Sequence, residues 1–156
     1  GTGGSGVKRL TLALSLMLSA WTARAYDAQI GDTLMELRIS PTEQGVSFGQ
    51  FLTPRVPVSV VAAMSLAGGY GNTPVGSLSL RAGYEQHHHG SAIVPRAAVE
   101  MGMAFDDAQG LGSLFGLRGG VVWYAIRSVG LGVDLGLHRR VGLARVDAAL
   151  SLLSRF

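Results

Sequence analysis

Charged side chains recur at alternate positions along this chain, in segments that are otherwise rich in apolar and small residues. Arginine and carboxylate groups form strong ion pairs, because the planar guanidinium group donates two parallel hydrogen bonds to one carboxylate. We expect equal numbers of both to pair in a common interior. The members of this predicted network are Asp32, Glu36, Glu85, Glu100, Asp134 and Asp147, together with Arg38, Arg81, Arg96, Arg118, Arg145 and Arg155.

The segments that carry these charges alternate between apolar and polar residues with a period of two, as β-strands do. In residues 129–138 the odd-numbered positions are Val or Leu, whereas the even-numbered positions are Gly, Asp or His. Sequences typical of turns separate eight such segments, which predicts an all-β fold. The segments are residues 28–39, 46–52, 58–69, 77–86, 92–105, 113–125, 129–138 and 144–156.

The charges are confined to one face of these segments, and the opposite face carries almost none. A secreted lipocalin-like barrel would reverse this pattern, with apolar residues inside and a mixed polar surface outside. The wall of a membrane barrel is apolar on its lipid-facing side and polar inside. The sequence therefore predicts an eight-stranded antiparallel up-and-down transmembrane β-barrel, with both termini on the periplasmic side.

Aromatic residues on the apolar face give a second indication, because membrane barrels carry aromatic girdles at both interfaces. The strand directions predict Phe48, Tyr70, Phe105 and Phe115 at the outer rim. The same directions predict Tyr84, Trp123 and Phe156 at the periplasmic rim.

The N-terminal sequence has the layout of a secretory signal peptide. Lys8 and Arg9 precede an apolar run over residues 10–20, and Ala23 and Ala25 form a small-x-small cleavage site. The run is shorter than the roughly 20 residues that a transmembrane helix needs. We expect residues 1–25 to comprise upstream residues and a cleaved signal peptide, and residues 26–156 to form the barrel.

Composition excludes several kinds of function. The formal net charge of +3 disappears with the signal peptide, which carries Lys8, Arg9 and Arg24. No basic surface for nucleic acid is therefore expected. The absence of cysteine excludes disulfides, thiolate metal sites and cysteine nucleophiles.

The last segment alternates and ends on an aromatic residue, with Leu150, Leu152 and Phe156 on its apolar face. With the signal peptide and the eight segments, this resembles small outer-membrane β-barrel proteins of the OmpA/OmpX type. The resemblance implies a bacterial outer-membrane location, lipid and lipopolysaccharide as surroundings, and recognition of the last strand by the outer-membrane assembly machinery. We expect a monomer.

The interior of an eight-stranded barrel is just wide enough to be filled by side chains. Inward glycines such as Gly102 and Gly132 leave room for the long arginines. We therefore expect a filled, salt-bridged interior and a structural or interaction role at the cell envelope, such as membrane integrity. A narrow pore is the alternative that this interior leaves open.

Two histidine-containing stretches have the residue types for binding or catalysis. His138, Arg139 and Arg140 lie at the predicted outer mouth, where arginine can bind lipopolysaccharide phosphates. A lipid A-modifying acyl hydrolase or transferase is a further alternative, since His138 could act with a hydroxyl nucleophile and an orienting acid. The candidates for those two roles are Ser40, Thr42 and Ser113, and Glu43 and Asp106. No motif links them, so we assign no catalytic residue and expect no enzyme.

The second stretch, residues 87–89, is a run of three histidines. Adjacent strand residues point to opposite sides, so the three cannot face one metal ion. We expect a solvated turn, and neither a metal site nor a cofactor.

Overall fold

The structure, a computed structural model, describes residues 28–65, 75–88, 91–106, 110–126, 128–140 and 143–156, without the side chains of Asp106, Arg140 and Leu143. The predicted signal peptide, Tyr70 and His89 lie outside these residues. None of the described residues belongs to a helix that is long and apolar enough to cross a membrane.

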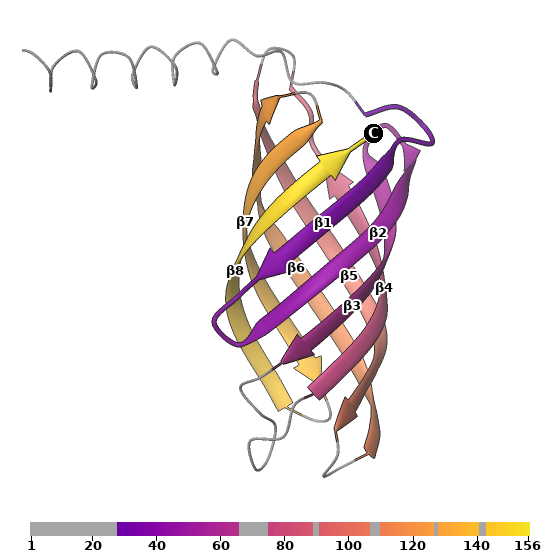
Figure 1. The fold of residues 1–156 in the computed structure, drawn as a ribbon, viewed down its shortest axis with the longest axis vertical. Helices are drawn as coiled ribbons and strands as arrows, with labels where there is room; N and C mark the ends of the chain where they lie inside the picture. Colours follow the sequence, from indigo (N-terminus) through magenta and orange to yellow (C-terminus); the bar gives the residue numbers. More distant parts are fainter. Residues whose placement is uncertain (1–27, 66–74, 89–90, 107–109, 127, 141–142) are drawn as a thin grey trace, which may run out of the picture.

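The described chain forms eight strands in sequence order, each antiparallel to its neighbours, in one closed barrel (Figure 1). The predicted all-β, up-and-down topology is therefore confirmed. The strands are β1 (Thr33–Ile39), β2 (Glu43–Thr53), β3 (Val56–Ser65), β4 (Val75–Glu85), β5 (Ile93–Asp106), β6 (Gly110–Ile126), β7 (Val129–Arg140) and β8 (Leu143–Arg155).

The first and last strands close the barrel. β1 pairs with β8 from Leu34 opposite Arg155 to Ile39 opposite Leu150. Beyond that register, Thr33 and Phe156 exchange two backbone hydrogen bonds, of 2.7 and 3.0 Å. We call the end of the barrel that holds Phe156 and the start of β1 the terminal end, and the opposite end the far end (Figure 1).

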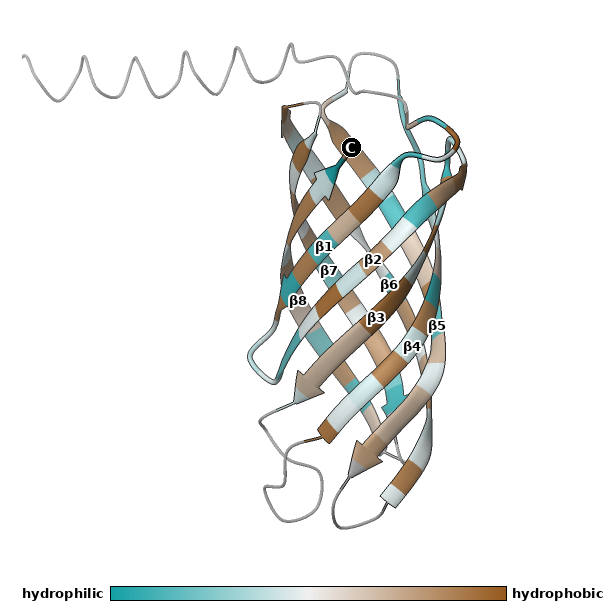
Figure 2. Cartoon of the chain, turned by 45° about the vertical axis from the view of Figure 1, so that its right-hand side comes forward, coloured by the Kyte–Doolittle hydropathy of each residue, from teal (hydrophilic) through white to brown (hydrophobic). Residues whose placement is uncertain are grey.

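The predicted faces of the strands agree with the burial of their side chains. Leu135 and Leu150 are 65% and 66% exposed on the exterior, whereas the neighbouring Asp134 and Ala149 are 3% exposed. Figure 2 shows the same alternation as bands of hydrophobic and hydrophilic colour along the ribbons. The barrel therefore has an apolar exterior and a polar interior.

The first two strands begin at different residues from those predicted, because side chains cap the adjacent turns. Asp32 lies in a turn before β1, where its carboxylate accepts a 2.9 Å hydrogen bond from the backbone N–H of Gln29. Ser40 ends β1, and its hydroxyl accepts a 2.9 Å bond from the backbone N–H of Glu43. This tight turn lets β2 begin at Glu43, three residues before the predicted start.

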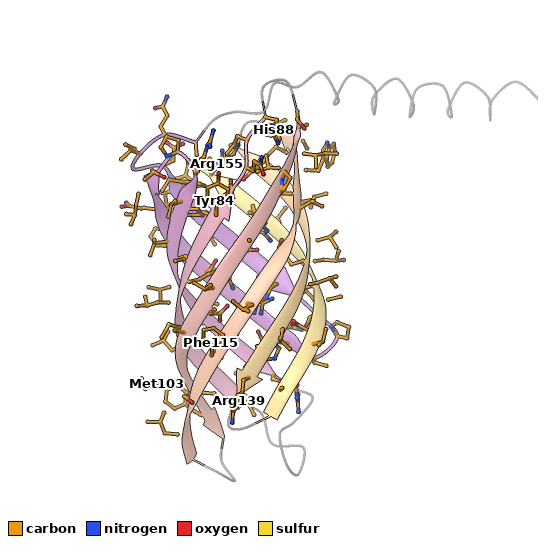
Figure 3. All side chains as sticks on the ribbon, turned by 180° about the vertical axis from the view of Figure 1, so that it is seen from behind. Tyr84, His88, Met103, Phe115, Arg139 and Arg155 are labelled. Atoms are coloured by element: carbon orange, nitrogen blue, oxygen red, sulfur yellow. The ribbon has the colours of Figure 1, made fainter. Side chains whose placement is uncertain are left out.

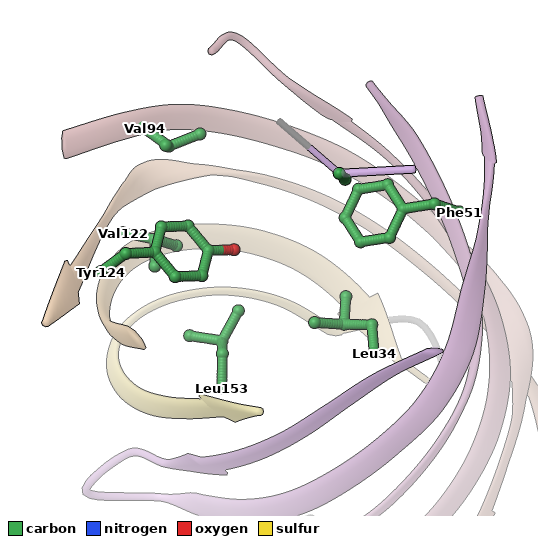
Figure 4. Close-up of a cluster of buried hydrophobic side chains, with 7 residues drawn as sticks. Leu34, Phe51, Val94, Val122, Tyr124 and Leu153 are labelled. Carbon is green, nitrogen blue, oxygen red and sulfur yellow. The ribbon is translucent and has the colours of Figure 1, made fainter. Parts of the chain in front are cut away.

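An apolar cluster lies inside the barrel and is drawn in Figure 4. Its side chains come from β1, β2, β5, β6 and β8, and from Ala28, which precedes β1. The members are between 0 and 5% exposed: Ala28, Leu34, Phe51, Val94, Val122, Tyr124 and Leu153. They lie near the ends of their strands at the terminal end, so that an apolar layer fills the interior there.

Two adjacent glycines on β6 differ in the space around them. A Cβ atom on Gly120 would lie 2.2 Å from the carbonyl oxygen of Val133 and 2.4 Å from a carboxylate oxygen of Asp134. A Cβ atom on Gly119 would meet nothing closer than 4.0 Å. Gly120 therefore lets β6 and β7 approach closely at this point, as glycines do where a sheet curves sharply.

We predict that Gly120→Ala lowers the free energy of unfolding by about 1–3 kcal/mol, because the backbone of β7 must move to admit the methyl group. The matched control is Gly119→Ala, whose methyl group has open space. Denaturant unfolding of both refolded variants, followed by tryptophan fluorescence, measures the difference. Equal stability of the two variants would show that the close approach of β6 and β7 does not require a glycine at position 120.

Candidate functional site

Glu36 of β1 lies at the centre of the interior charge network. It accepts a 2.7 Å hydrogen bond from Nη1 of Arg81 on β4 and a 2.8 Å bond from Nη2 of Arg96 on β5. The Glu36 side chain is 4% exposed, and those of the two arginines are 10 and 13% exposed. Buried charges are stable only when such partners satisfy them, so each arginine compensates the desolvation of this carboxylate.

Arg96 joins Glu36 to the β7–β8 side of the barrel. Its Nε donates a 2.8 Å bond to Oδ1 of Asp134, and Nη2 bonds the other oxygen of that carboxylate. The hydroxyl of Ser151 on β8 lies 2.8 Å from the same Nη2 atom. One guanidinium group therefore connects strands β1, β5, β7 and β8.

Glu100 of β5 holds the next layer toward the far end. It accepts bonds of 3.1 and 3.3 Å from Arg81, and a 2.6 Å bond from the hydroxyl of Ser79. Nε of Arg118 lies 3.5 Å from the same carboxylate. Arg38 in turn bonds Glu43, the first residue of β2.

The contacts of Asp147 on β8 are longer than those at the centre of the network. Nδ1 of His138 lies 3.6 Å from Oδ1 of Asp147, and Nη1 of Arg118 lies 4.0 Å from Oδ2 of Asp147. Neither oxygen of Asp147 accepts a direct hydrogen bond from a described residue. Both distances exceed the usual N–H···O range, so Asp147 is less tightly paired than Glu36 and Glu100.

Arg155 of β8 connects the network to the apolar cluster at the terminal end, where Figure 3 labels it near Tyr84 and His88. Its Nη2 bonds Glu85 at 3.0 Å and also the hydroxyl of Tyr124. The guanidinium carbon lies 4.9 Å from the ring centre of Phe51 and 4.5 Å from that of Tyr124. Ion pairing and cation–π contacts together fix this cation against the apolar layer.

A cavity of about 40 Å³ lies beside the central ion pairs and is bordered by Glu36, Arg81, Arg96 and Asp134. At 10–15 Å³ for each water molecule, it has room for about three. It is far smaller than the roughly 300–1,000 Å³ of a typical small-molecule site. The arrangement is suited to hydrating a buried ionic network rather than to holding a substrate.

The structure assembles a set that differs from the predicted network in one of its acids. Asp32 belongs to the turn before β1, and its position among the interior acids is taken by Glu43. Arg145 lies half-buried on the inner face of β8, opposite His138 in the register. The sequence placed Glu43 in a turn, and only the capping role of Ser40 could have indicated that β2 starts there.

His87 was also misplaced by the prediction of a solvated turn. Its side chain is 3% exposed, and Nε2 lies 3.1 Å from Oε2 of Glu85. The inward side of β4 carries odd-numbered residues, so the two-residue period continues past the strand end and turns His87 inward. His88, the next residue, is exposed.

The three residues predicted to contact lipopolysaccharide do not share one face. His138 points inward and is 7% exposed, whereas Arg139 lies exposed on the exterior. The side chain of Arg140 lies outside the described part of the structure. The prediction that all three residues contact lipopolysaccharide together is therefore wrong, because His138 and Arg139 face opposite sides of the wall.

The hydroxyl candidates for a catalytic site are not assembled around His138. Ser113 is on the exterior face of β6, on the other side of the wall from His138. Ser40 bonds the backbone of Glu43, and Glu43 pairs with Arg38. Among the described residues, His138 has a carboxylate neighbour in Asp147 but no hydroxyl within hydrogen-bonding distance.

Only some of the aromatic residues predicted for the two rims lie near the ends of their strands. Phe105 is the residue before the last of β5 at the far end, while Tyr84 and Phe156 lie at the terminal end. Trp123 lies near the terminal end of β6. Phe48 lies at the midpoint of β2, opposite Met35 and Val60, rather than at the far rim. The two-residue period shows that Phe48 faces outward but not how high it lies.

No protein-family model matches the chain, and no curated protein sequence matches it significantly. Among solved structures, the chain is similar to the N-terminal β-barrel domain of Pseudomonas aeruginosa OprF. The TM-score is 0.64 at 16% identity, covering 83% of this chain and 99% of that one.

Two further structures show the same likeness. Neisserial surface protein A has a TM-score of 0.57 at 14% identity, covering 81% of this chain and 94% of its own. A chain described as a de novo designed transmembrane β-barrel has a TM-score of 0.59 at 10% identity, covering 84% and 100%. The resemblance to small eight-stranded outer-membrane barrels is therefore confirmed for the fold.

We predict that Arg96→Met lowers the free energy of unfolding by about 3–5 kcal/mol, because it leaves the buried carboxylates of Glu36 and Asp134 without a shared cation. Adding Asp134→Asn to this variant should restore part of the loss, since one of the stranded charges is then removed. Denaturant unfolding of the two variants measures both effects.

The control is Arg55→Met, which removes an exposed arginine of the turn between β2 and β3. Exposed cations contribute little to stability, so this variant should unfold as the wild type does. Similar losses for Arg55→Met and Arg96→Met would show that the interior network has no special role.

Proposed function

We propose that this chain is an integral outer-membrane β-barrel protein with a structural role in a bacterial envelope, and that residues 1–25 contain a cleaved signal peptide. The observation that carries the proposal is the apolar exterior of the closed barrel. Leu80, Met101 and Leu135 are 63, 63 and 65% exposed on three different strands. Water-soluble monomers rarely expose contiguous apolar patches beyond a few hundred Å², whereas a lipid bilayer solvates such a surface.

Strand dimensions also support a membrane position. A transmembrane β-strand tilted by about 45° needs about 9–11 residues. Seven of the eight strands have between 10 and 17 residues, while β1 has 7. The closed sheet leaves no strand edge, as a lipid environment requires.

Both described ends of the chain lie at the terminal end, which places that end on the periplasmic side in our proposal. The far end then faces outward, and lipid with lipopolysaccharide surrounds the exterior. The last strand, with Phe156 after it, is the segment that the outer-membrane assembly machinery would recognise. Because each strand already pairs on both sides, the barrel needs no second copy to complete its sheet.

The side chains that fill the interior support a structural role. Its centre holds ion pairs that cross the barrel, and its terminal end holds the apolar cluster beneath Arg155. Both arrangements place side chains across the interior of the described part of the barrel. No described hydroxyl group lies within hydrogen-bonding distance of His138, so the pore and enzyme alternatives gain no support.

The membrane proposal is tested by placing a charge at two depths on β6. Leu117 is the eighth of seventeen residues of this strand, and Leu111 is the second. In lipid vesicles, Leu117→Arg should reduce the unfolding free energy by about 2–4 kcal/mol, and Leu111→Arg by about 0–1 kcal/mol, because the cost of a charge falls toward the interface.

Heated and unheated samples of both variants on SDS gels, with circular dichroism, establish folding before stability is measured. A folded barrel should show a heat-dependent mobility shift and a β spectrum. A chain that folds in buffer without lipid or detergent, and that tolerates arginine equally at both positions, would contradict a membrane position.

The filled interior predicts electrical silence. Wild-type protein in planar lipid bilayers should give no discrete conductance steps, since ions would have to cross the apolar layer of Phe51, Tyr124 and Leu153. An open porin of known conductance serves as the positive control. Reproducible steps at matched protein concentration would favour a pore.

A further inference from the structure

Arg139 is unusual because it is a cation on an apolar wall. The inward residues of β7 are even-numbered, including Asp134 and His138, so Arg139 follows Leu137 on the exterior face. Among the strand residues whose side chains the structure describes, Arg139 is the one charged residue that faces outward. The other strand arginines whose side chains are described face the interior.

The neighbours of Arg139 leave its guanidinium group accessible. In the strand register, Arg139 lies opposite Phe115 of β6 on one side and opposite Ala144 of β8 on the other. Phe115 supplies an aromatic surface, and Ala144 is too small to cover the cation. No described residue forms an ion pair or a hydrogen bond with the Arg139 side chain.

The height of Arg139 on the barrel is consistent with a membrane interface. It is the residue before the last of β7, and Figure 3 shows it toward the far end of the barrel. A charge at mid-membrane is costly, but the cost falls to about 0–1 kcal/mol near the interface. A long side chain there directs its charged group toward the headgroups while its stem stays against lipid.

We infer that Arg139 binds the phosphate of an anionic membrane lipid, held against the outer wall of the barrel beside Phe115. Guanidinium groups bind phosphate with two parallel charge-assisted hydrogen bonds, and no described residue occupies the donors of Arg139. The inference rests on the proposed membrane position. With the far end facing outward, the lipid carrying this phosphate is of the lipid A type.

The experiment measures binding of purified lipid A to the refolded chain in a neutral detergent, by native mass spectrometry over a lipid titration. Arg139→Gln should weaken binding about tenfold, the loss expected for one charge-assisted contact. Arg139→Lys should restore part of the affinity, because lysine keeps the charge but not the paired donors. Leu111→Gln is the matched control, since it adds the same amide at the same end and leaves Arg139 in place.

A second measurement separates a lipid from a free anion. Wild-type protein in phosphatidylcholine vesicles should gain stability when lipid A is included, and Arg139→Gln should lose most of that gain. Inorganic phosphate alone should not reproduce the gain. If it does, the site is a general anion site and the lipid assignment is overturned.

Two outcomes separate the lipid site from the membrane position of the barrel. Equal lipid A binding by wild type and Arg139→Gln, with normal insertion into vesicles, overturns the inference alone. A chain that does not insert into vesicles at all overturns both.

Discussion

The pairing of β1 with β8 closes the sheet and gives every strand a hydrogen-bonded neighbour on both sides. An open eight-stranded sheet would leave two rows of backbone donors and acceptors without partners, which is tolerable in water and costly in lipid. Closure removes both rows and divides every strand into an inner and an outer face. The pairing of Thr33 with Phe156 extends this seam to the last residue of the sequence. The apolar exterior and the charged interior both follow from this division into two faces.

The inner face is too narrow for bulk water and must therefore neutralise its own charges. The structure does so in layers, with Glu36 and Glu100 shared by several arginines and Arg155 held between Glu85 and two aromatic rings. Shared partners make the groups interdependent, since removing one guanidinium leaves more than one carboxylate uncompensated. Small residues supply the space: a Cβ atom on Gly132 would lie 2.3 Å from the Ser151 hydroxyl and 3.0 Å from Arg96. The glycines thus provide the space that the polar side chains of the interior occupy.

The sequence predicted the faces of the strands well, because the two-residue period follows directly from backbone geometry. Leu131 and Asp134 needed no structure to be assigned to opposite sides. Strand ends were harder, since they depend on turns: the Ser40 cap moves Glu43 into the barrel and the Gln29–Asp32 turn takes Asp32 out of it. Partners were not predictable. That Arg96 bonds Glu36, sixty positions earlier, depends on the stagger between strands, which no local pattern records.

The seam between β1 and β8 also has a temporal consequence. Its residues lie at opposite ends of the barrel sequence, and ion-paired residues such as Glu85 and Arg155 are separated by 70 positions. Long-range contacts of this kind are formed late, because a large loop must close before any of them contributes. A growing barrel therefore carries unpaired arginines and an exposed strand edge until its last strand arrives. The seam and these ion pairs are therefore complete only once β8, with its thirteen residues, is in place.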